Sequence, residues 1–129
     1  METMLLDAAE KLFAAEITPT LIAALEDGQD AQPLWNTLNA AGLADALLRE
    51  EDGGVGLAFP AFFPLARASG AHGVPLPLIE TALLRPLLGQ PVAGAVAIAS
   101  LAHKTLDGWH AARVPYGAVA EALALEIEG

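Results

Sequence analysis

The chain has 129 residues, 54% of them hydrophobic, which excludes a disordered tail and allows one good core with a small second subdomain. Sixteen Asp and Glu against six scattered Lys and Arg set the formal charge at −10, which excludes a nucleic-acid-binding surface because a polyanion would be repelled. The absence of cysteine excludes disulfides, thiolate nucleophiles and cysteine-based metal sites.

Neither a membrane anchor nor an export signal is predicted. The longest apolar run, 93–99, is far too short to cross a bilayer. The segment 1–16 is amphipathic and carries several acidic residues, whereas a secretory signal needs a basic start and an uninterrupted apolar middle. We therefore expect a cytoplasmic protein without a membrane partner.

Two helices are predicted at the start of the chain. Thr18 and Pro19 mark the boundary between them, since threonine is a favoured N-cap and proline is favoured at the first helical position. The second helix is expected to end at Gly28, which suits the C′ position. Apolar residues at helical spacing define the buried faces: Leu5, Leu6, Ala9, Leu12, Phe13 and Ile17 in the first helix, and Leu21, Ile22 and Leu25 in the second.

A third helix is expected between Asp30, a suitable cap, and Gly42, which stops it. Its apolar residues are Leu34, Trp35, Leu38 and Ala41. Both tryptophans, Trp35 and Trp109, are interpreted as packing residues rather than as platforms for a ligand.

The segment 42–57 is predicted to be a loop that Leu47 and Leu48 anchor to the core. The acidic cluster 50–52 is interpreted as solvated rather than as an acid–base pair, because nothing cationic or apolar nearby in the sequence favours such chemistry. The motif Gly53-Gly54-x-Gly56 has the wrong spacing for a phosphate cradle. Its adjacent glycines permit instead a positive-φ turn or the close approach of another backbone.

A fourth helix is predicted over 59–69. Pro60 fits its first turn, whereas Pro64 should kink the helix or mark a later start. Gly70 and Gly73 are expected to end it.

A fifth helix is predicted from Pro77 through Leu84. Pro86 should bend or end this helix, and Gly89 should close the segment. The leucines at its end are expected to form an exposed patch that a partner could cover: Leu83, Leu84, Leu87 and Leu88.

The character of the chain changes after Pro91. Strands are predicted over 95–99, over 109–114 and over 123–127, where Leu123, Leu125 and Ile127 alternate with smaller or charged residues. We therefore expect a mainly α fold with a boundary near 90–94. A helical domain would cover 1–90 and a partial β domain 91–129.

The histidines and serines do not predict a catalytic or metal site. His72, His103 and His110 lack the spacing and the carboxylates of a metal centre, so they are interpreted as surface or locally bonded side chains. Ser69 and Ser100 do not lie in a Gly-x-Ser-x-Gly motif, so neither is assigned as a nucleophile.

Three segments in the same order resemble the N-terminal part of the acyl-CoA dehydrogenase family. The segment 50–56 is similar to the family's Pro-Glu-Glu-Tyr-Gly-Gly-x-Gly loop, although Arg49 replaces its proline and Asp52 its aromatic residue. Pro-Leu-Pro-Leu-Ile-Glu-Thr at 75–81 resembles a helix start of bacterial members, including those that act on steroid side chains. Arg-Val-Pro-Tyr-Gly at 113–117 resembles an Arg-Val-Pro-Trp-Gly turn in the β domain of similar members.

The resemblance implies a helical bundle followed by the first strands of a β domain. It also implies a parent reaction in which FAD desaturates an acyl-CoA thioester between its α and β carbons, in fatty-acid or steroid side-chain metabolism. The family's Thr-Glu-Pro and Gly-Ser-Asp flavin pattern is missing from the comparable stretch 98–103, and its catalytic carboxylate would lie beyond Gly129. We therefore assign no catalytic, flavin-binding or metal-binding residue. We expect the chain alone to bind no FAD and to be catalytically incomplete.

Within that resemblance, Phe59, Phe62 and Phe63 could line an acyl pocket, but at least two of them are expected to be core residues. Apolar side chains of 59–68 are expected to form part of the pocket wall. The implied partners are an acyl-CoA substrate for the complete enzyme and either a second copy or a related dehydrogenase subunit.

Two other functions remain open. The first is a non-catalytic dehydrogenase-like subunit or oligomerisation module that binds a partner chain. The second is a helical domain of unrelated role, whose likeness to the family comes from its Ala- and Leu-rich composition.

Overall fold

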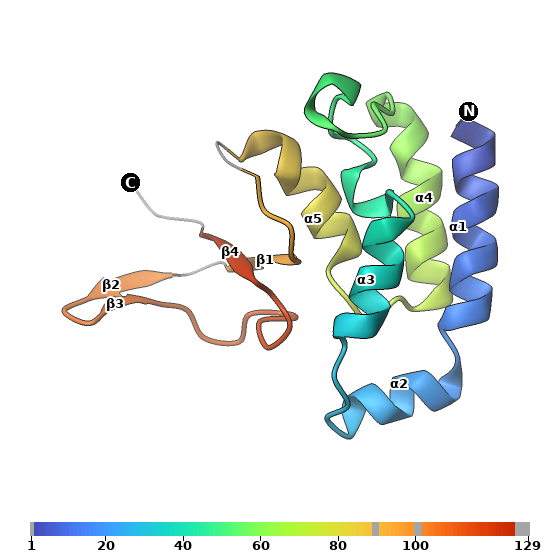
Figure 1. The fold of residues 1–129 in the computed structure, drawn as a ribbon. Helices are drawn as coiled ribbons and strands as arrows, with labels where there is room; N and C mark the ends of the chain where they lie inside the picture. The colour runs from blue at the N-terminus through green and yellow to red at the C-terminus, as the bar shows by residue number, and fades with distance from the viewer. Residues whose placement is uncertain (1, 89–90, 100–101, 126–129) are drawn as a thin grey trace.

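The computed structural model describes residues 2–88, 91–99 and 102–125 and confirms a mainly α fold with a few strands. Figure 1 shows the helices side by side, with α2 crossing below them and the strands on the far side of α5. Within the described ranges no helix is both long and apolar enough to cross a membrane. The α-helices are α1 (Glu2–Glu16), α2 (Pro19–Glu26), α3 (Gln32–Ala40), α4 (Phe59–His72) and α5 (Leu78–Leu84). The 3₁₀ turns are η1 (Leu43–Asp45), η2 (Glu50–Asp52) and η3 (Arg85–Leu87), and the strands are β1 (Val96–Ala99), β2 (His103–Thr105), β3 (Gly108–His110) and β4 (Ala122–Leu125).

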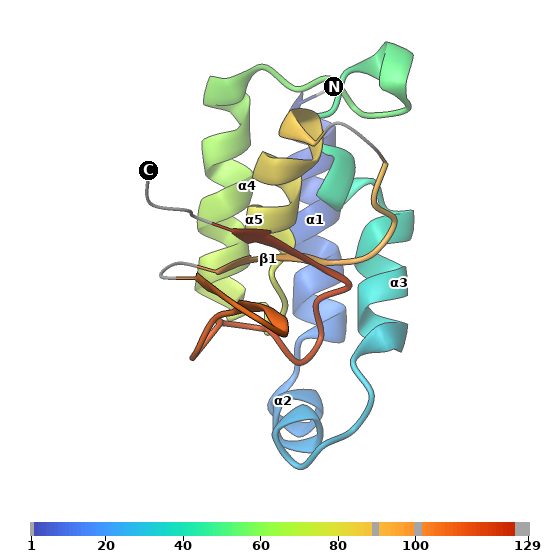
Figure 2. The same cartoon turned by 90° about the vertical axis from the view of Figure 1, so that its left-hand side faces the viewer.

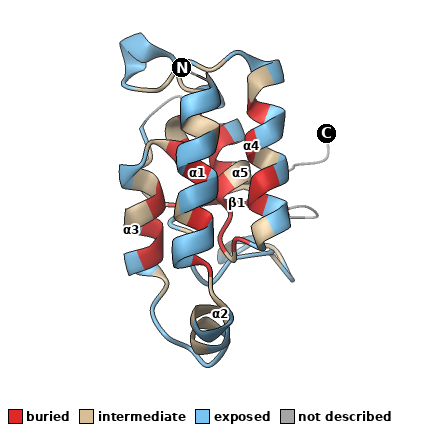
Figure 3. Ribbon diagram, turned by 90° about the vertical axis from the view of Figure 1, so that its right-hand side faces the viewer, coloured by how far each residue is buried: buried red, intermediate tan, exposed pale blue. Residues whose placement is uncertain are grey.

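The boundaries of the first two helices follow the prediction, but Leu21, Ile22 and Leu25 of α2 are only half-buried. The face of α1 that was predicted to be apolar lies against the core, whereas its other face is exposed (Figure 3). Thr18 caps α2, because its Oγ1 accepts a hydrogen bond of 3.1 Å from the backbone N–H of Leu21. Gly28 follows the C-cap residue with a φ of +97°, as a C′ glycine does.

Helix α3 starts one residue later than a cap at Asp30 implies. Its N-cap residue is Ala31, but the Asp30 carboxylate still accepts a hydrogen bond of 3.0 Å from the backbone of Gln32. Gly42, with a φ of +80°, ends the helix as predicted. The predicted apolar face is buried at Leu34, Trp35 and Leu38.

The segment 42–57 is more ordered than the predicted loop, and its main anchors differ. It folds into the two turns η1 and η2, and Leu43, Ala44 and Ala46 are buried in the core. Leu47 is only partly buried against that core. The predicted anchor Leu47 is thus confirmed in part, while the tight turns bring Leu43, Ala44 and Ala46 deeper into the core.

Helix α4 is longer than predicted. It continues through Pro64 and ends at His72, so Gly70 lies inside it and only Gly73, with a φ of +65°, stops it. The prediction that at least two phenylalanines are core residues is wrong, because only Phe62 is buried. Phe59 and Phe63 are 55% and 57% exposed. One helical turn apart, these two rings share the outward face and pack edge to face with centroids 5.1 Å apart.

The strands form two small sheets within the described residues. β1 pairs in parallel with β4, and β2 pairs with β3 as an antiparallel hairpin. The predicted strand over 109–114 is shortened to β3, and the sequence analysis missed β2. The alternation predicted over 123–127 fails at Leu123, which is 46% exposed, and Ile127 lies outside the described residues.

Strand β1 packs directly against α5 and lies across the helical layer (Figure 2). The Thr81 hydroxyl donates to the carbonyl of Pro77 at 2.6 Å and accepts from the backbone N–H of Val96 at 2.9 Å. Ala95, just before β1, belongs to the same buried cluster as the helices. The segment after α5 therefore shares the helical core, which positions the later turn 113–117 beside the helices.

Candidate functional site

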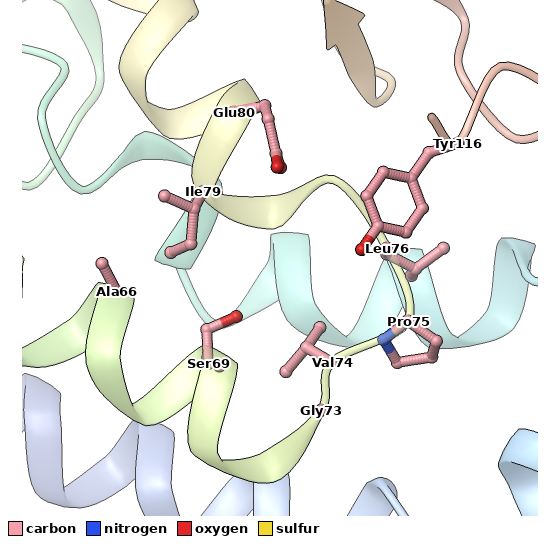
Figure 4. Close-up of a pocket in the computed structure, with 10 residues that line it drawn as sticks. Ala66, Ser69, Gly73, Val74, Pro75, Leu76, Ile79, Glu80 and Tyr116 are labelled. Atoms are coloured by element: carbon pink, nitrogen blue, oxygen red, sulfur yellow. The ribbon is translucent and has the colours of Figure 1, made fainter. Parts of the chain in front are cut away.

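A hollow of about 380 Å³ lies where the end of α4, the start of α5 and the turn after β3 meet (Figure 4). Ala66 and Ser69 of α4 form one wall, and Ile79 and Glu80 of α5 form another. Tyr116 closes a further side, although it lies 36 positions after Glu80 in the printed sequence. The hollow is thus built by segments that only the tertiary fold brings together.

Glycine and proline residues shape the floor of this hollow. Gly73 takes the left-handed conformation that ends α4, and Pro75 and Pro77 prevent the helix from resuming at once. Leu76 and Leu78 are 4% and 0% exposed and hold this connection to the core. The sequence motif at 75–81 therefore fixes both the floor and one wall of the hollow.

A strained turn presents Tyr116 to the hollow. Tyr116 and Arg113 have φ values of +60° and +55°, a region that non-glycine residues rarely occupy. Three backbone hydrogen bonds of 3.0–3.1 Å hold the turn, from Gly117 to Val114 and from both Val119 and Ala120 to Tyr116. Strain of this kind is concentrated at ligand sites and is maintained by the surrounding structure.

The hollow offers apolar walls with a few polar groups. Val74, Leu76 and Ile79 contribute the apolar surface. The polar groups are the Ser69 hydroxyl, the Glu80 carboxylate and the Tyr116 hydroxyl (Figure 4). Such a composition suits a small apolar group with one or two hydrogen-bonding atoms.

Among the residues that the structure describes, no histidine is arranged as a base for Ser69. Ser69 is buried at 6% exposure, and the His72 ring packs against the ring of Phe13 with centroids 5.8 Å apart. Ser100, the other serine considered, lies outside the described residues. The arrangement of Ser69 and His72 therefore does not indicate acyl-transfer chemistry by a serine nucleophile.

A buried arginine that the sequence analysis did not single out forms a second polar centre. Arg85 is 8% exposed, pairs with Asp45 at 2.7 Å and donates to the Asn39 side chain at 3.0 Å. Its other terminal nitrogen donates to the carbonyl of Ala93 at 2.7 Å, and its guanidinium lies 5.8 Å from the centre of the Trp35 ring. The sequence did contain a signal for this buried site, namely a single cation within the leucine-rich run 83–88. The network ties α3, η1 and η3 to the segment that leads into β1.

The acidic cluster 50–52 is exposed, as predicted. The adjacent Arg49 pairs with Glu51 at 2.6 Å and with Asp52 at 2.8 Å. All three side chains are between 46% and 71% exposed, so the cluster is a solvated surface group rather than a catalytic centre.

Two of the histidines are brought together by the fold. His103 and His110 are direct partners across the β2–β3 hairpin, and their rings stack with centroids 5.9 Å apart. Among the described residues no three His, Asp or Glu side chains gather as a possible metal centre.

The predictions for the leucine patch and for the two tryptophans are each confirmed in part. Leu83 and Leu87 are exposed, at 36% and 80%, so these two leucines form an outward patch as predicted. Trp35 is a packing residue at 4% exposure, whereas Trp109 is 44% exposed and does not fit that prediction. Leu84 and Leu88 are half-buried.

The described residues do not fit a flavin site. In the stretch 98–103, which the resemblance compares with the family's flavin pattern, the described residues 98–99 and 102–103 are Ile, Ala, Ala and His and carry no hydroxyl group. The nearest buried hydroxyl, that of Thr81, is already used by Pro77 and Val96. We therefore derive no step through FAD from these residues. Comparisons with protein families, curated proteins and solved structures found no match to this chain.

Proposed function

We propose that this chain forms the helical domain and the opening of the β domain of an acyl-CoA dehydrogenase-like protein. The observation that supports this best is the hollow described above. Two of the three segments that resemble the family, 75–81 and 113–117, are far apart in the sequence and line the same hollow. A chance likeness of Ala- and Leu-rich helices gives no reason for these segments to meet.

The third segment supports the proposal through its backbone. A Cβ atom built on Gly54 would overlap the backbone carbonyl oxygen of Leu48, so only glycine fits there. Gly53 has a φ of +90° and ends the turn η2. The adjacent glycines of the resemblance thus correspond to two different backbone requirements of this fold.

The role that we propose for the hollow is to hold part of the acyl group of an acyl-CoA. Ile79 and Val74 would contact its hydrocarbon, and the hydroxyl of Tyr116 would be a hydrogen-bond donor toward a carbonyl oxygen. In the parent reaction the flavin supplies the electron acceptor, and desaturation removes a proton from the α carbon and a hydride from the β carbon. We assign neither transfer to a residue of this chain.

Binding of an acyl-CoA is therefore expected to depend on Ile79. Replacing Ile79 with tryptophan should fill the hollow and weaken binding of a medium-chain acyl-CoA by about tenfold, a change of about 1.4 kcal/mol. Nuclear magnetic resonance titration of the purified chain measures this affinity. Leu106→Ala is the matched control, because Leu106 lies fully exposed at the tip of the hairpin. Equal affinity of the chain for coenzyme A and for acyl-CoA would contradict the proposed role of the hollow.

Enzymatic function is tested on the protein as cells make it, together with any chain that co-purifies. Acyl-CoA thioesters with fatty and steroid side chains are offered with an artificial electron acceptor, and the enoyl-CoA product is measured. We expect turnover and bound flavin in the native assembly, but neither in the isolated chain of 129 residues. A native assembly that contains no flavin and oxidises no acyl-CoA would refute the dehydrogenase proposal.

A second candidate is a non-catalytic dehydrogenase-like subunit that binds a partner chain. The exposed Leu83 and Leu87 favour it, because they lie one helical turn apart and form an outward apolar patch. Replacing both with serine should shift the sedimentation coefficient of the native assembly toward that of the free chain. Lys11→Ser on α1 is a suitable surface control. An unchanged coefficient in the leucine variant would exclude this patch as the contact.

A further inference from the structure

The hairpin β2–β3 carries two imidazole side chains at directly opposed positions. His103 pairs with His110 in the antiparallel register, and Lys104 pairs with Trp109 next to them. Because successive side chains of a strand point to opposite faces, His103 and His110 share one face and Lys104 lies on the other. The charge of Lys104 is therefore directed away from the imidazoles.

The two rings are close and accessible. Their centroids are 5.9 Å apart, the angle between their planes is 27°, and both residues are exposed. Figure 1 shows the hairpin projecting away from the helices, so solvent reaches it freely. The ligand nitrogens of a tetrahedral zinc ion lie roughly 3.3 Å apart, since each zinc–nitrogen bond is about 2.0–2.1 Å. Directly opposed residues have Cβ atoms about 4.5–5.5 Å apart, a span across which two exposed imidazoles can rotate to place one nitrogen each on the same ion.

The hairpin itself holds the two ligands in register. Its turn is closed by Thr105, whose hydroxyl donates to the carbonyl of Gly108 at 3.1 Å and accepts from the backbone N–H of Asp107 at 3.2 Å. A metal ion bound by one imidazole therefore finds the second already nearby, which raises the affinity above that of a single histidine.

We propose that His103 and His110 form a chelating site for a borderline divalent metal ion such as zinc, with water completing the coordination. Imidazole nitrogen binds zinc, nickel and copper, whereas magnesium and calcium prefer oxygen ligands. The bound ion links β2 to β3 and so stabilises the hairpin that lies between β1 and β4 in the chain. This proposal is independent of the acyl-CoA proposal, because the site shares no residue with the hollow.

The test is a zinc titration of the tag-free chain, followed through the ring signals of its histidines. We expect the signals of His103 and His110 to move together and to saturate at micromolar zinc. The ring of His72, packed against Phe13, should stay unchanged, and magnesium should have no effect. Zinc that moves carboxylate signals but neither hairpin imidazole would overturn the proposal, because the ion would then bind the acidic surface.

Two variants and a control separate chelation from other binding. His103→Ala and His110→Ala should each weaken zinc binding by about tenfold or more, because a single imidazole remains. Lys104→Ala changes the same strand on its other face and should leave the affinity for zinc unchanged. Core methyl signals report whether each variant keeps its fold, and removal of zinc with a chelator from the unaltered chain should restore the original ring signals. Wild-type affinity in either histidine variant would refute the two-histidine site.

Discussion

Replacing Arg85 with alanine is expected to lower the free energy of unfolding by about 3 kcal/mol, at the lower end of the range for breaking a buried ion pair. The Arg85 side chain is 6% exposed, and its guanidinium pairs with Asp45 at 2.7 Å. Removing it leaves that carboxylate without its partner and the carbonyl of Ala93 without its donor. The lower end applies because the Asp45 side chain keeps 29% of its surface exposed and is partly solvated. Urea unfolding, followed by circular dichroism, measures the change.

Arg49→Ala is the matched control for the Arg85 substitution. Arg49 also forms two ion pairs, but its side chain is 71% exposed, so the loss should stay below about 1 kcal/mol. A double variant in which Arg85 becomes methionine and Asp45 becomes asparagine should recover part of the stability lost in Arg85→Met, because no unpaired charge then remains. Similar losses at Arg85 and Arg49 would show that the buried network does not tie the elements together.

The local rules of helix formation predicted most of the helical layer. The predicted caps at Thr18, Gly28 and Gly42 are confirmed, because each cap depends only on neighbouring residues. The end of α4 was harder to predict, because Gly70 and Gly73 are both permissible stops. The helix passes Gly70 and reaches His72, whose ring packs against Phe13 of α1, a tertiary contact that no local pattern predicts.

The sites were less predictable because they join segments that are distant in the sequence. The motifs at 75–81 and 113–117 were recognised individually, but nothing in either predicts that Tyr116 faces Ile79 and Glu80. The burial of Arg85 likewise depends on acceptors at Asn39, Asp45 and Ala93. A sequence pattern can identify such residues only after the fold has positioned their partners.

The pairing of His103 with His110 lies between these two extremes of predictability, because it depends on a local turn but not on distant segments. The dipeptide Asp107-Gly108 is a signal for a tight hairpin, and it was not used in the sequence analysis. The structure places the two loop residues at Leu106 and Asp107, one position earlier than a two-residue Asp-Gly loop would, and only this register brings His103 opposite His110. The spacing of seven that argued against a metal site is thus the spacing that brings the two rings together across the hairpin.

Replacing Gly54 with alanine is expected to cost about 2–3 kcal/mol of stability, because the new methyl group meets backbone. A Cβ at this position would overlap the Leu48 carbonyl and lie 2.5 Å from the Leu48 Cβ. That carbonyl accepts a hydrogen bond of 2.8 Å from Gly56, and Gly54 itself donates to Arg49 at 2.9 Å. Relief of the overlap therefore requires breaking at least one of the hydrogen bonds that close this loop.

Gly70→Ala is the matched control for Gly54, since it adds the same methyl group where nothing lies within 4 Å. Gly70 is inside α4, so alanine should increase stability by about 0.5–1 kcal/mol through its better helix propensity. Urea unfolding of both variants should thus give changes of opposite sign. A stable Gly54→Ala protein would mean that the loop tolerates a side chain there. The fold would then give no reason for two adjacent glycines, and this loop would no longer support the acyl-CoA dehydrogenase resemblance.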